Sequence, residues 1–376
     1  MNSVTAIQSL QTLKTEGNPV TTVYLDVSTS QKLRNADIVV NNMFKQKKEK
    51  TFYKKLSDEE KESVRKDVEG IIKFLKNQLG EERRSLMIVS SNRAYVWKVI
   101  HLGFLVENMM VIQDRPYLRP FLECISHERN YAIVLVDQGK AKILINHLGN
   151  KEELFNVVNL LPEDANEGGF GGMDERKNER HREEVVAKHY KNVAAQLDTL
   201  DQKYHFDWII LGGLRESMSD FANYLKSGLK DKIAREIPVD PNLSMDKVFQ
   251  LVDKEIPGCR IDFEKDILNM FANEFHKNYK GVAGIYQTEE ALQQGQVDML
   301  MIQDGFQTKG RVCKWCLHMT TEEEDTCPNC GHTMARTLDI TDELIHMALD
   351  TGAKIEFISS DMGEFSPLCG LLRYKP

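Results

Sequence analysis

The sequence has no run of about 20 apolar residues, the length that a membrane-spanning helix needs. Its first 17 residues are polar and lack the apolar core of a signal peptide, so we expect a cytoplasmic protein. Internal repeats and low-complexity tracts are also missing. With 41% hydrophobic and 28% charged residues, the composition excludes a disordered or fibrous chain.

The sequence also has fewer basic residues than acidic ones. Lysine and arginine number 49 against 57 aspartates and glutamates, and the formal net charge is −8. This balance argues against a protein that coats nucleic acid by bulk charge, although it leaves room for a local basic face. The 376 residues exceed what one hydrophobic core usually supports. We expect three domains of mixed α/β layers, over residues 1–126, 127–262 and 263–376.

Periodicity predicts the elements of these domains. In the first domain we expect strands at 21–27, 85–90 and 94–102, charged helices over 32–79 and a helix at 121–129. In the middle domain we expect a hairpin of 131–137 with 141–145, a strand at 207–213, and helices at 175–205, 217–229 and 244–255. In the last domain we expect helices at 263–278, 288–295 and 342–352, and strands at 299–302, 354–358 and 371–374.

Four of the seven cysteines form a C-x2-C-x10-C-x2-C pattern, namely Cys313, Cys316, Cys327 and Cys330. A tight turn between paired thiols can present both sulfur atoms to one tetrahedral ion, and Gly331 follows the second pair where such a turn favours positive φ. Four thiolates would fill the coordination shell of zinc, so we expect a structural zinc ribbon at about 311–333, inserted in the last domain. His318 and His332 are alternative ligands, and chance clustering of reduced thiols is the competing interpretation.

A glycine-rich loop, Gly168-Gly169-Phe170-Gly171-Gly172-Met173, precedes the expected long helix. Without a Cβ, such a backbone can bring its N–H groups close to a ligand, although an ordinary surface loop has the same composition. Basic residues follow at once and could meet phosphates along the helix: Arg176, Lys177, Arg180 and Arg182. Acidic residues lie among them, so a solvated charged helix is the alternative.

From residue 131 onward the chain resembles the class I release factors of eukaryotes and archaea and their relative Pelota, and within that superfamily the bacterial branch. Three segments carry the resemblance. The stretch from Leu161 through the glycine loop to Arg182-Glu183-Glu184 is similar to the family's catalytic loop and helix. Residues 291–298 resemble its Ala-Leu-x-x-Gly-Ala-Val turn, and residues 351–361 with 372–374 resemble its C-terminal strands.

The resemblance implies a ribosome-associated protein that acts in ribosome rescue or in termination-like handling of peptidyl-tRNA. In the family, Gly-Gly-Gln enters the peptidyl-transferase centre and helps water attack the peptidyl-tRNA ester. Aligning Arg182-Glu183-Glu184 with the family's Arg-Glu-Glu places Gly171, Gly172 and Met173 on Gly-Gly-Gln. Gly168-Gly169-Phe170 is the alternative register, and it also lacks the glutamine. Methionine lacks the amide of glutamine, so whether the protein is an enzyme stays open: any activity would be peptidyl-tRNA ester hydrolysis on the ribosome.

The first domain lacks the family's codon-reading Asn-Ile-Lys-Ser and Tyr-Cys signatures, which argues against stop-codon recognition. The resemblance implies rRNA and tRNA as partners, and a translational GTPase could bind at the last domain. A non-enzymatic scaffold that binds RNA or protein, and that kept the fold but lost hydrolysis, is the alternative function. No convergent set of carboxylates or histidines in the sequence supports an unrelated hydrolase or nuclease.

Overall fold

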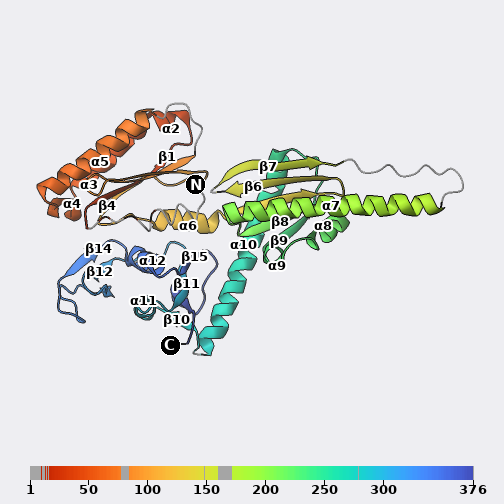
Figure 1. Ribbon diagram of the computed structural model, residues 1–376. Coiled ribbons are helices and arrows are strands. Elements are labelled where there is room, and N and C mark those ends of the chain that lie inside the picture. Colours follow the sequence, from red (N-terminus) through yellow and green to blue (C-terminus); the bar gives the residue numbers. More distant parts are fainter. Residues whose placement is uncertain are drawn as a thin grey trace. The chain divides into compact units, whose positions relative to one another are not determined.

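The computed structural model describes residues 17–77, 84–147, 149–159, 172–277 and 279–375, together with Leu10, Leu13 and Thr15. The chain divides into two units, whose elements are labelled in Figure 1. Unit 1 combines the residues up to His127 with those from Arg260 onward, and unit 2 contains Glu128–Cys259. The first and last expected domains therefore lie in one unit, and their separation into two domains stays a prediction.

The first sheet of unit 1 is antiparallel, in the order β3-β2-β1-β4. Its strands are β1 (Val20–Asp26), β2 (Ser85–Ser91), β3 (Val96–Leu102) and β4 (Met109–Gln113). The helices of this region are α2 (Ser30–Arg34), α3 (Ala36–Lys48), α4 (Thr51–Lys55), α5 (Asp58–Asn77) and α6 (Arg119–His127). The structure confirms the three expected strands, while β4 was not expected.

Both faces of this sheet are buried, and alternate residues of β1 belong to different cores. Val23 and Leu25 pack with α3 and α5, whereas Val20 and Tyr24 belong to a core shared with the last region of the chain. Successive side chains of a strand point to opposite faces, so the run of apolar residues in β1 serves both layers. Burial on both faces is what makes the first and last regions one unit.

The last region forms a second sheet, in the order β10-β16-β11-β15, with β11 and β15 parallel. Its strands are β10 (Gly281–Ala283), β11 (Val297–Gln303), β15 (Lys354–Ile358) and β16 (Leu368–Leu372). Its helices are α11 (Ile285–Gln293) and α12 (Ile340–Asp350). A small third sheet, order β13-β12-β14, consists of β12 (Gly310–Cys313), β13 (Met319–Thr320) and β14 (Met334–Thr337).

The start of α12 joins the two regions through buried charges. Asp339 caps the helix by accepting a hydrogen bond from the Thr341 backbone N–H, and it also contacts Arg119 at 3.1 Å. Asp342 accepts a hydrogen bond of 3.1 Å from Gln113, and burial raises the pKa of Asp342 to about 7. Burying a carboxylate without hydrogen-bond or ionic partners costs free energy. Asp339 and Asp342 therefore limit where the segments that supply their partners can lie.

Unit 2 has a five-stranded sheet in the order β7-β6-β5-β8-β9. Its strands are β5 (Tyr131–Val136), β6 (Lys140–His147), β7 (Asn150–Val158), β8 (Trp208–Gly213) and β9 (Ile233–Pro238). The expected hairpin is confirmed as the antiparallel pair β5–β6, and β5, β8 and β9 run parallel. Its helices are α7 (Gly172–Tyr204), α8 (Arg215–Ala222), α9 (Ser227–Lys230) and the first part of α10 (Met245–His276).

One expected break is wrong: residues 244–255 and 263–278 do not form two helices, because α10 runs through from Met245 to His276. Pro257 and Gly258 lie between the two expected helices, and both disfavour a helix interior, since proline removes one helical hydrogen bond and glycine costs backbone entropy. The helix instead buries Val248 and Val252 on one unit and Ile267 and Phe271 on the other, and this packing on both sides of the proline outweighs its penalty.

Strands β7 and β9 were also missed. Strand β7 lies at the edge of the sheet and has the sequence Asn-Lys-Glu-Glu-Leu-Phe-Asn-Val-Val. This sequence is rich in charged residues and lacks the clear alternation of apolar and polar residues that predicts a strand. Charged side chains are a usual feature of edge strands because they discourage pairing with other chains.

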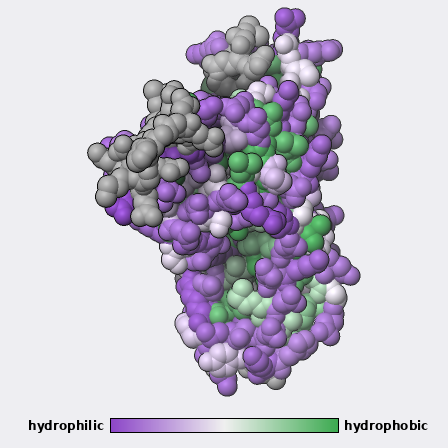
Figure 2. Space-filling view, turned by 90° about the vertical axis from the view of Figure 1, so that its right-hand side faces the viewer, coloured by the Kyte–Doolittle hydropathy of each residue, from purple (hydrophilic) through white to green (hydrophobic). Residues whose placement is uncertain are grey.

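None of the helices in the described residues is long and apolar enough to cross a membrane. On the face shown in Figure 2, hydrophilic residues predominate and hydrophobic patches lie between them.

A single carboxylate fixes α10 to the sheet of the last region. Glu264, whose side chain is buried, accepts hydrogen bonds from the backbone N–H and the hydroxyl of both Ser359 and Ser360, and its Oε1 lies 2.8 Å from Arg260 Nε. Burial alone would raise the pKa of Glu264, but these hydrogen bonds lower it to about 2. The folded state therefore favours the ionised carboxylate.

We expect Glu264→Gln to destabilise unit 1 by about 2 kcal/mol, because the amide N–H2 would face donors where the carboxylate now accepts. The depressed pKa means that the stabilisation is complete above the unfolded-state pKa of about 4.3 and is lost as the pH falls toward about 2. Chemical denaturation between pH 7 and pH 3 measures both effects. Asp266→Asn, an exposed change on the same helix, serves as the control and should leave stability and its pH dependence nearly unchanged.

Candidate functional site

The long helix α7 is the first part of the candidate site. Gly172 and Met173 are its first two residues, so the expected helix begins directly at the second glycine pair. Gly171 and the earlier glycines lie outside the described residues. For Met173, Arg176 and Lys177 the structure describes the helical backbone but not the side chains. The assignment of Gly171, Gly172 and Met173 as catalytic residues stays a prediction.

The second half of α7 packs on the sheet of unit 2. Tyr190, Val193 and Leu197 recur at helical spacing, and all three are buried against the hairpin, β8 and α8. The first half of α7 extends past the end of the sheet (Figure 1), and most of its described residues, 179–188, are exposed. The 17 residues from Gly172 to Lys188 correspond to roughly 25 Å of helix.

Three basic residues share one side of α7, two of them in this projecting segment and Lys191 just beyond it, in the half that packs on the sheet. Arg180, Lys188 and Lys191 are exposed and lie within about 80° of one another around the helix axis, with Glu184 between them. Glu179 and Glu183 lie toward a neighbouring side. Arg182 points elsewhere and donates a hydrogen bond of 3.0 Å to Gln138 Oε1 in the turn of the β5–β6 hairpin. Of the four predicted RNA-binding residues, the two with described side chains therefore differ: Arg180 is exposed, and Arg182 makes a contact that holds the helix.

The base of the loop is held by residues that the sequence analysis missed. Asn159 is the last described residue before the glycine loop, and its backbone N–H donates to Gly139 O at 2.7 Å. Its side-chain nitrogen lies 2.7 Å from Nδ1 of His189, which is buried on α7. Burial lowers the pKa of His189, which favours the neutral ring that can accept this hydrogen bond. A lone histidine in a helical pattern gave no sequence signal for this contact.

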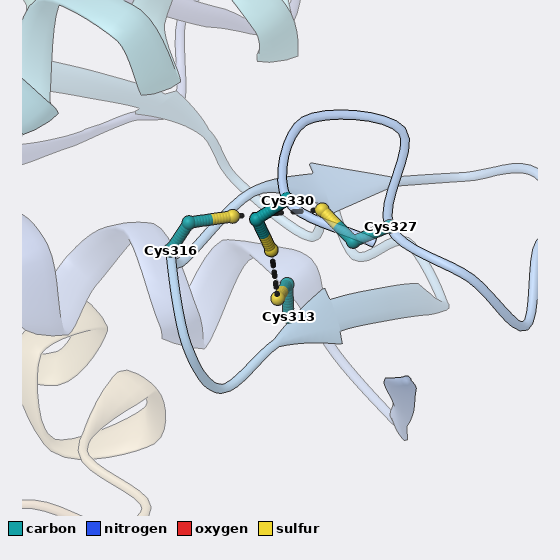
Figure 3. Close-up of side chains that lie close together, drawn as sticks. All are labelled: Cys313, Cys316, Cys327 and Cys330. Carbon is teal, nitrogen blue, oxygen red and sulfur yellow. Dashed lines mark hydrogen bonds between the residues drawn. The ribbon is translucent and has the colours of Figure 1, made fainter. Parts of the chain in front are cut away.

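The four cysteines come together as the sequence predicts. Cys313 ends β12, Cys316 follows it, and Cys327 and Cys330 come from the segment before β14; Figure 3 shows the four sulfur atoms converging. The Sγ atoms all lie within 4.8 Å of one another. The separation is 3.4 Å between Cys313 and Cys330 and 3.5 Å between Cys316 and Cys327.

The two cysteine pairs sit in equivalent turns. Leu317 N–H donates to Cys313 O at 2.8 Å, and Gly331 N–H donates to Cys327 O at 2.9 Å. Cys313 N–H donates to His318 O, and Cys327 N–H donates to His332 O, both at 2.8 Å. Leu317 and Gly331, the residue after each pair, have φ of 62° and 75°. Two unrelated segments thus adopt the same backbone, which is the geometry that presents four sulfur atoms to one tetrahedral ion.

The chemistry of these thiols also fits a metal ion. Backbone N–H groups of Cys316 and Trp315 lower the pKa of Cys313 to about 6, which favours the thiolate form that binds metal. Burial raises the pKa of Cys316 to about 12, so that thiol would lose its proton only when a metal ion binds. The two candidate alternative ligands have other partners. His318 Nδ1 lies 3.2 Å from Glu289 Oε1, and the His332 ring stacks on Trp315 with centroids 4.7 Å apart. Cysteines alone form the converging set.

Two family models match this chain. One is described as bacterial archaeo-eukaryotic release factor family 10 and matches residues 116–255, and the other is described as eRF1 domain 3 and matches residues 261–376. Over these two regions, which together make up most of its length, the chain is similar to the superfamily of archaeo-eukaryotic class I release factors. The resemblance seen in the sequence is therefore confirmed for the middle and last regions.

Curated relatives in this superfamily are peptide chain release factors. Peptide chain release factor subunit 1 of Pyrococcus abyssi is 28% identical over 291 residues, which cover 68% of this chain and 69% of the relative. The protein of the same description from Archaeoglobus fulgidus is 23% identical over 353 residues, which cover 85% of this chain and 86% of the relative. The chain thus aligns with more than two thirds of each release factor.

The solved structures that align with this chain include a termination factor and a termination-like factor. The crystal structure of the archaeal translation termination factor aRF1 aligns with 99% of this chain and 97% of its own, at 16% identity and a TM-score of 0.28. Dom34 of S. cerevisiae is described as a translation termination-like factor that is involved in RNA quality control pathways and interacts with Hbs1. It aligns with 77% of this chain and 81% of its own, at 12% identity and a TM-score of 0.43.

Gly331 offers a test of the paired turns. Its φ of 75° is costly for any residue with a Cβ, although no atom would clash with one. We expect Gly331→Ala to destabilise the turn by about 1 kcal/mol and to speed the release of a bound metal ion to a chelator about fivefold. Gly70→Ala, in the interior of α5, is the control: it should stabilise slightly and leave metal release unchanged. Equal release rates for both variants would contradict the metal-binding turn.

Proposed function

We propose that this protein works on the ribosome, in ribosome rescue or in termination-like handling of peptidyl-tRNA. The observation that carries the proposal is the pair of family matches, which run from residue 116 to residue 376 with a gap of five residues between them. Relatives that align with more than two thirds of their own length are named as peptide chain release factors. Such work would place the protein in the cytoplasm, with rRNA and tRNA as its partners.

The geometry of α7 supports this function. The helix is anchored by a buried face from His189 to Leu197 and by Arg182, so its first half can carry Gly172 away from the body of unit 2. Arg180, Lys188 and Lys191 would meet RNA phosphates along the way. The contact between Asn159 and His189 fixes the chain before the glycine loop to α7. This restraint would reduce the conformational entropy lost when the loop enters the peptidyl-transferase centre.

Hydrolysis would depend on the tip of the loop. When water attacks the ester carbon, negative charge gathers on the carbonyl oxygen until the bond to the tRNA 3′ oxygen breaks and that oxygen takes a proton. A backbone N–H at Met173 could stabilise the developing charge as well as one from glutamine could. The methionine side chain offers only a weak acceptor sulfur and cannot orient water as an amide can. We therefore expect weak hydrolysis or none.

The four cysteines would hold a zinc ion. Zinc accepts four thiolates in tetrahedral geometry and would leave no position for water, so its contribution would be to the fold of residues 311–333. On the side of the small sheet where the cysteines lie, the cluster of buried apolar residues consists of Cys313, Cys327 and Met334, whereas Val312 and Met319 pack into the larger core of unit 1. Trp315 is exposed and stacks on His332 at the surface of the ribbon. A partner such as a translational GTPase could bind there.

The second candidate is a non-enzymatic scaffold that binds RNA or protein. Met173 in place of glutamine favours it, as do the glutamates that interrupt the basic face of α7. The two candidates share the same ribosome or RNA contact and differ in chemistry. A release assay separates them, because a scaffold would bind without breaking the ester bond.

Peptide release from stalled ribosomes tests the catalytic assignment. We expect slow release by the wild type and an increase of at least about tenfold for Met173→Gln, because the amide restores a group that positions water. Gly172→Val should abolish the release seen with Met173→Gln, since a branched side chain blocks close approach of the backbone. No gain from Met173→Gln would favour the scaffold, and fast wild-type release abolished by Gly172→Val would contradict weak hydrolysis.

Ribosome binding tests the basic face. The double change Lys188→Glu with Lys191→Glu should weaken cosedimentation with ribosomes about tenfold or more at low salt and reduce the salt dependence of binding. Lys247→Glu with Lys254→Glu makes the same change of charge at exposed positions of α10 and provides the control. Equal losses for both double variants would mean that only net charge matters, and no ribosome binding by the wild type would contradict the proposed function.

A further inference from the structure

A second cluster of possible metal ligands lies in unit 1, far along the sequence from the four cysteines. Glu123 and His127 are four residues apart on α6, so both side chains lie on one side of the helix. Asp304 follows β11 directly. One ligand atom from each of the three residues lies within 4.8 Å of the other two. Sequence spacing gave no hint of this cluster, because about 180 residues separate α6 from Asp304.

Two buried atoms of the cluster lack hydrogen bonds. His127 Nε2 lies 3.2 Å from Asp304 Oδ1, yet that oxygen accepts no hydrogen bond in the described part of the chain. His127 Nδ1 is likewise buried without a hydrogen-bond partner there. Buried polar atoms normally have partners, and an ion between His127 Nε2 and the carboxylate would supply one for Asp304 Oδ1. A 3.2 Å separation is close to that of two ligand atoms each about 2.1 Å from one zinc ion.

The charges around the cluster leave room for a divalent cation. Arg260 lies 3.2 Å from Asp304, but it is also paired with Glu264 at 2.8 Å. Arg119 lies 3.9 Å from Glu123 and is closer to Asp339, at 3.1 Å. Two arginines, Arg119 and Arg260, therefore face four carboxylates, which belong to Glu123, Glu264, Asp304 and Asp339. With a neutral His127, this group of side chains carries two excess negative charges. One divalent ion would balance them.

We propose that Glu123, His127 and Asp304 bind a divalent transition-metal ion of the zinc type. One imidazole and two carboxylates suit such an ion, and three protein ligands leave a fourth position for water. The ion would join α6, which follows the first sheet, to the end of β11 in the last sheet. This proposal is independent of ribosome binding, since it concerns the cohesion of unit 1.

Cobalt substitution of the full-length protein distinguishes the two clusters. Cobalt bound by four thiolates gives intense sulfur-to-metal charge-transfer bands, whereas cobalt bound by nitrogen and oxygen gives only weak visible bands. We expect two equivalents of cobalt or zinc per chain by elemental analysis, one of each spectral type. Glu123→Gln and His127→Ala should lower the affinity of the second equivalent at least about tenfold while the sulfur bands remain unchanged.

His276→Ala is the matched control, because His276 lies 3.1 Å from Glu364 in the same unit but has no third ligand beside it among the described residues. This variant should keep both equivalents. Glu123→Gln preserves size and shape, so it tests the site even where His127→Ala does not fold. The proposal is overturned by a wild-type protein that shows the sulfur bands alone, or by a second equivalent that Glu123→Gln binds as tightly as the wild type.

Discussion

The structure of unit 1 depends on the burial of its first sheet on both faces. Tyr24 of β1 belongs to a core that also contains Leu344 and Phe357 from the last region, while Val23 packs on the helices of the first region. A sheet with one exposed face could fold with its own helices alone. This sheet exposes no such face, so residues more than 300 positions apart in sequence must come together before either region is fully buried.

Charged groups within this interface fix the arrangement that hydrophobic burial alone would leave loose. Apolar contact is non-directional, whereas the pairing of Arg119 with Asp339 and of Gln113 with Asp342 is satisfied in only one register. Asp339 also caps α12, so the same carboxylate orients a helix and joins two regions. Glu264 acts similarly on α10 through Ser359 and Ser360. Each of these carboxylates couples local helix geometry to a distant segment.

The sequence predicted what local patterns determine and missed what depends on distant partners. The β5–β6 hairpin, the extent of α7 and the cysteine turns follow from alternation, helical spacing and C-x2-C pairs, and the structure agrees with each. The break at Pro257 was wrong because packing on either side of the proline decides the helix there. The contacts of Glu264 and His127 could not be foreseen, since their partners lie between about 90 and 180 residues away.

The contrast between the two halves of α7 explains how a protein with net charge −8 could still serve as a ribosome ligand. Its anchored half contributes apolar surface to unit 2, and its projecting half carries Arg180 and Lys188 exposed on one face. A local field of this kind acts over about 8 Å at physiological salt, so the acidic surface elsewhere does not cancel it at the point of contact. Affinity would then depend on a few basic residues of α7, and chemistry on the residue at position 173.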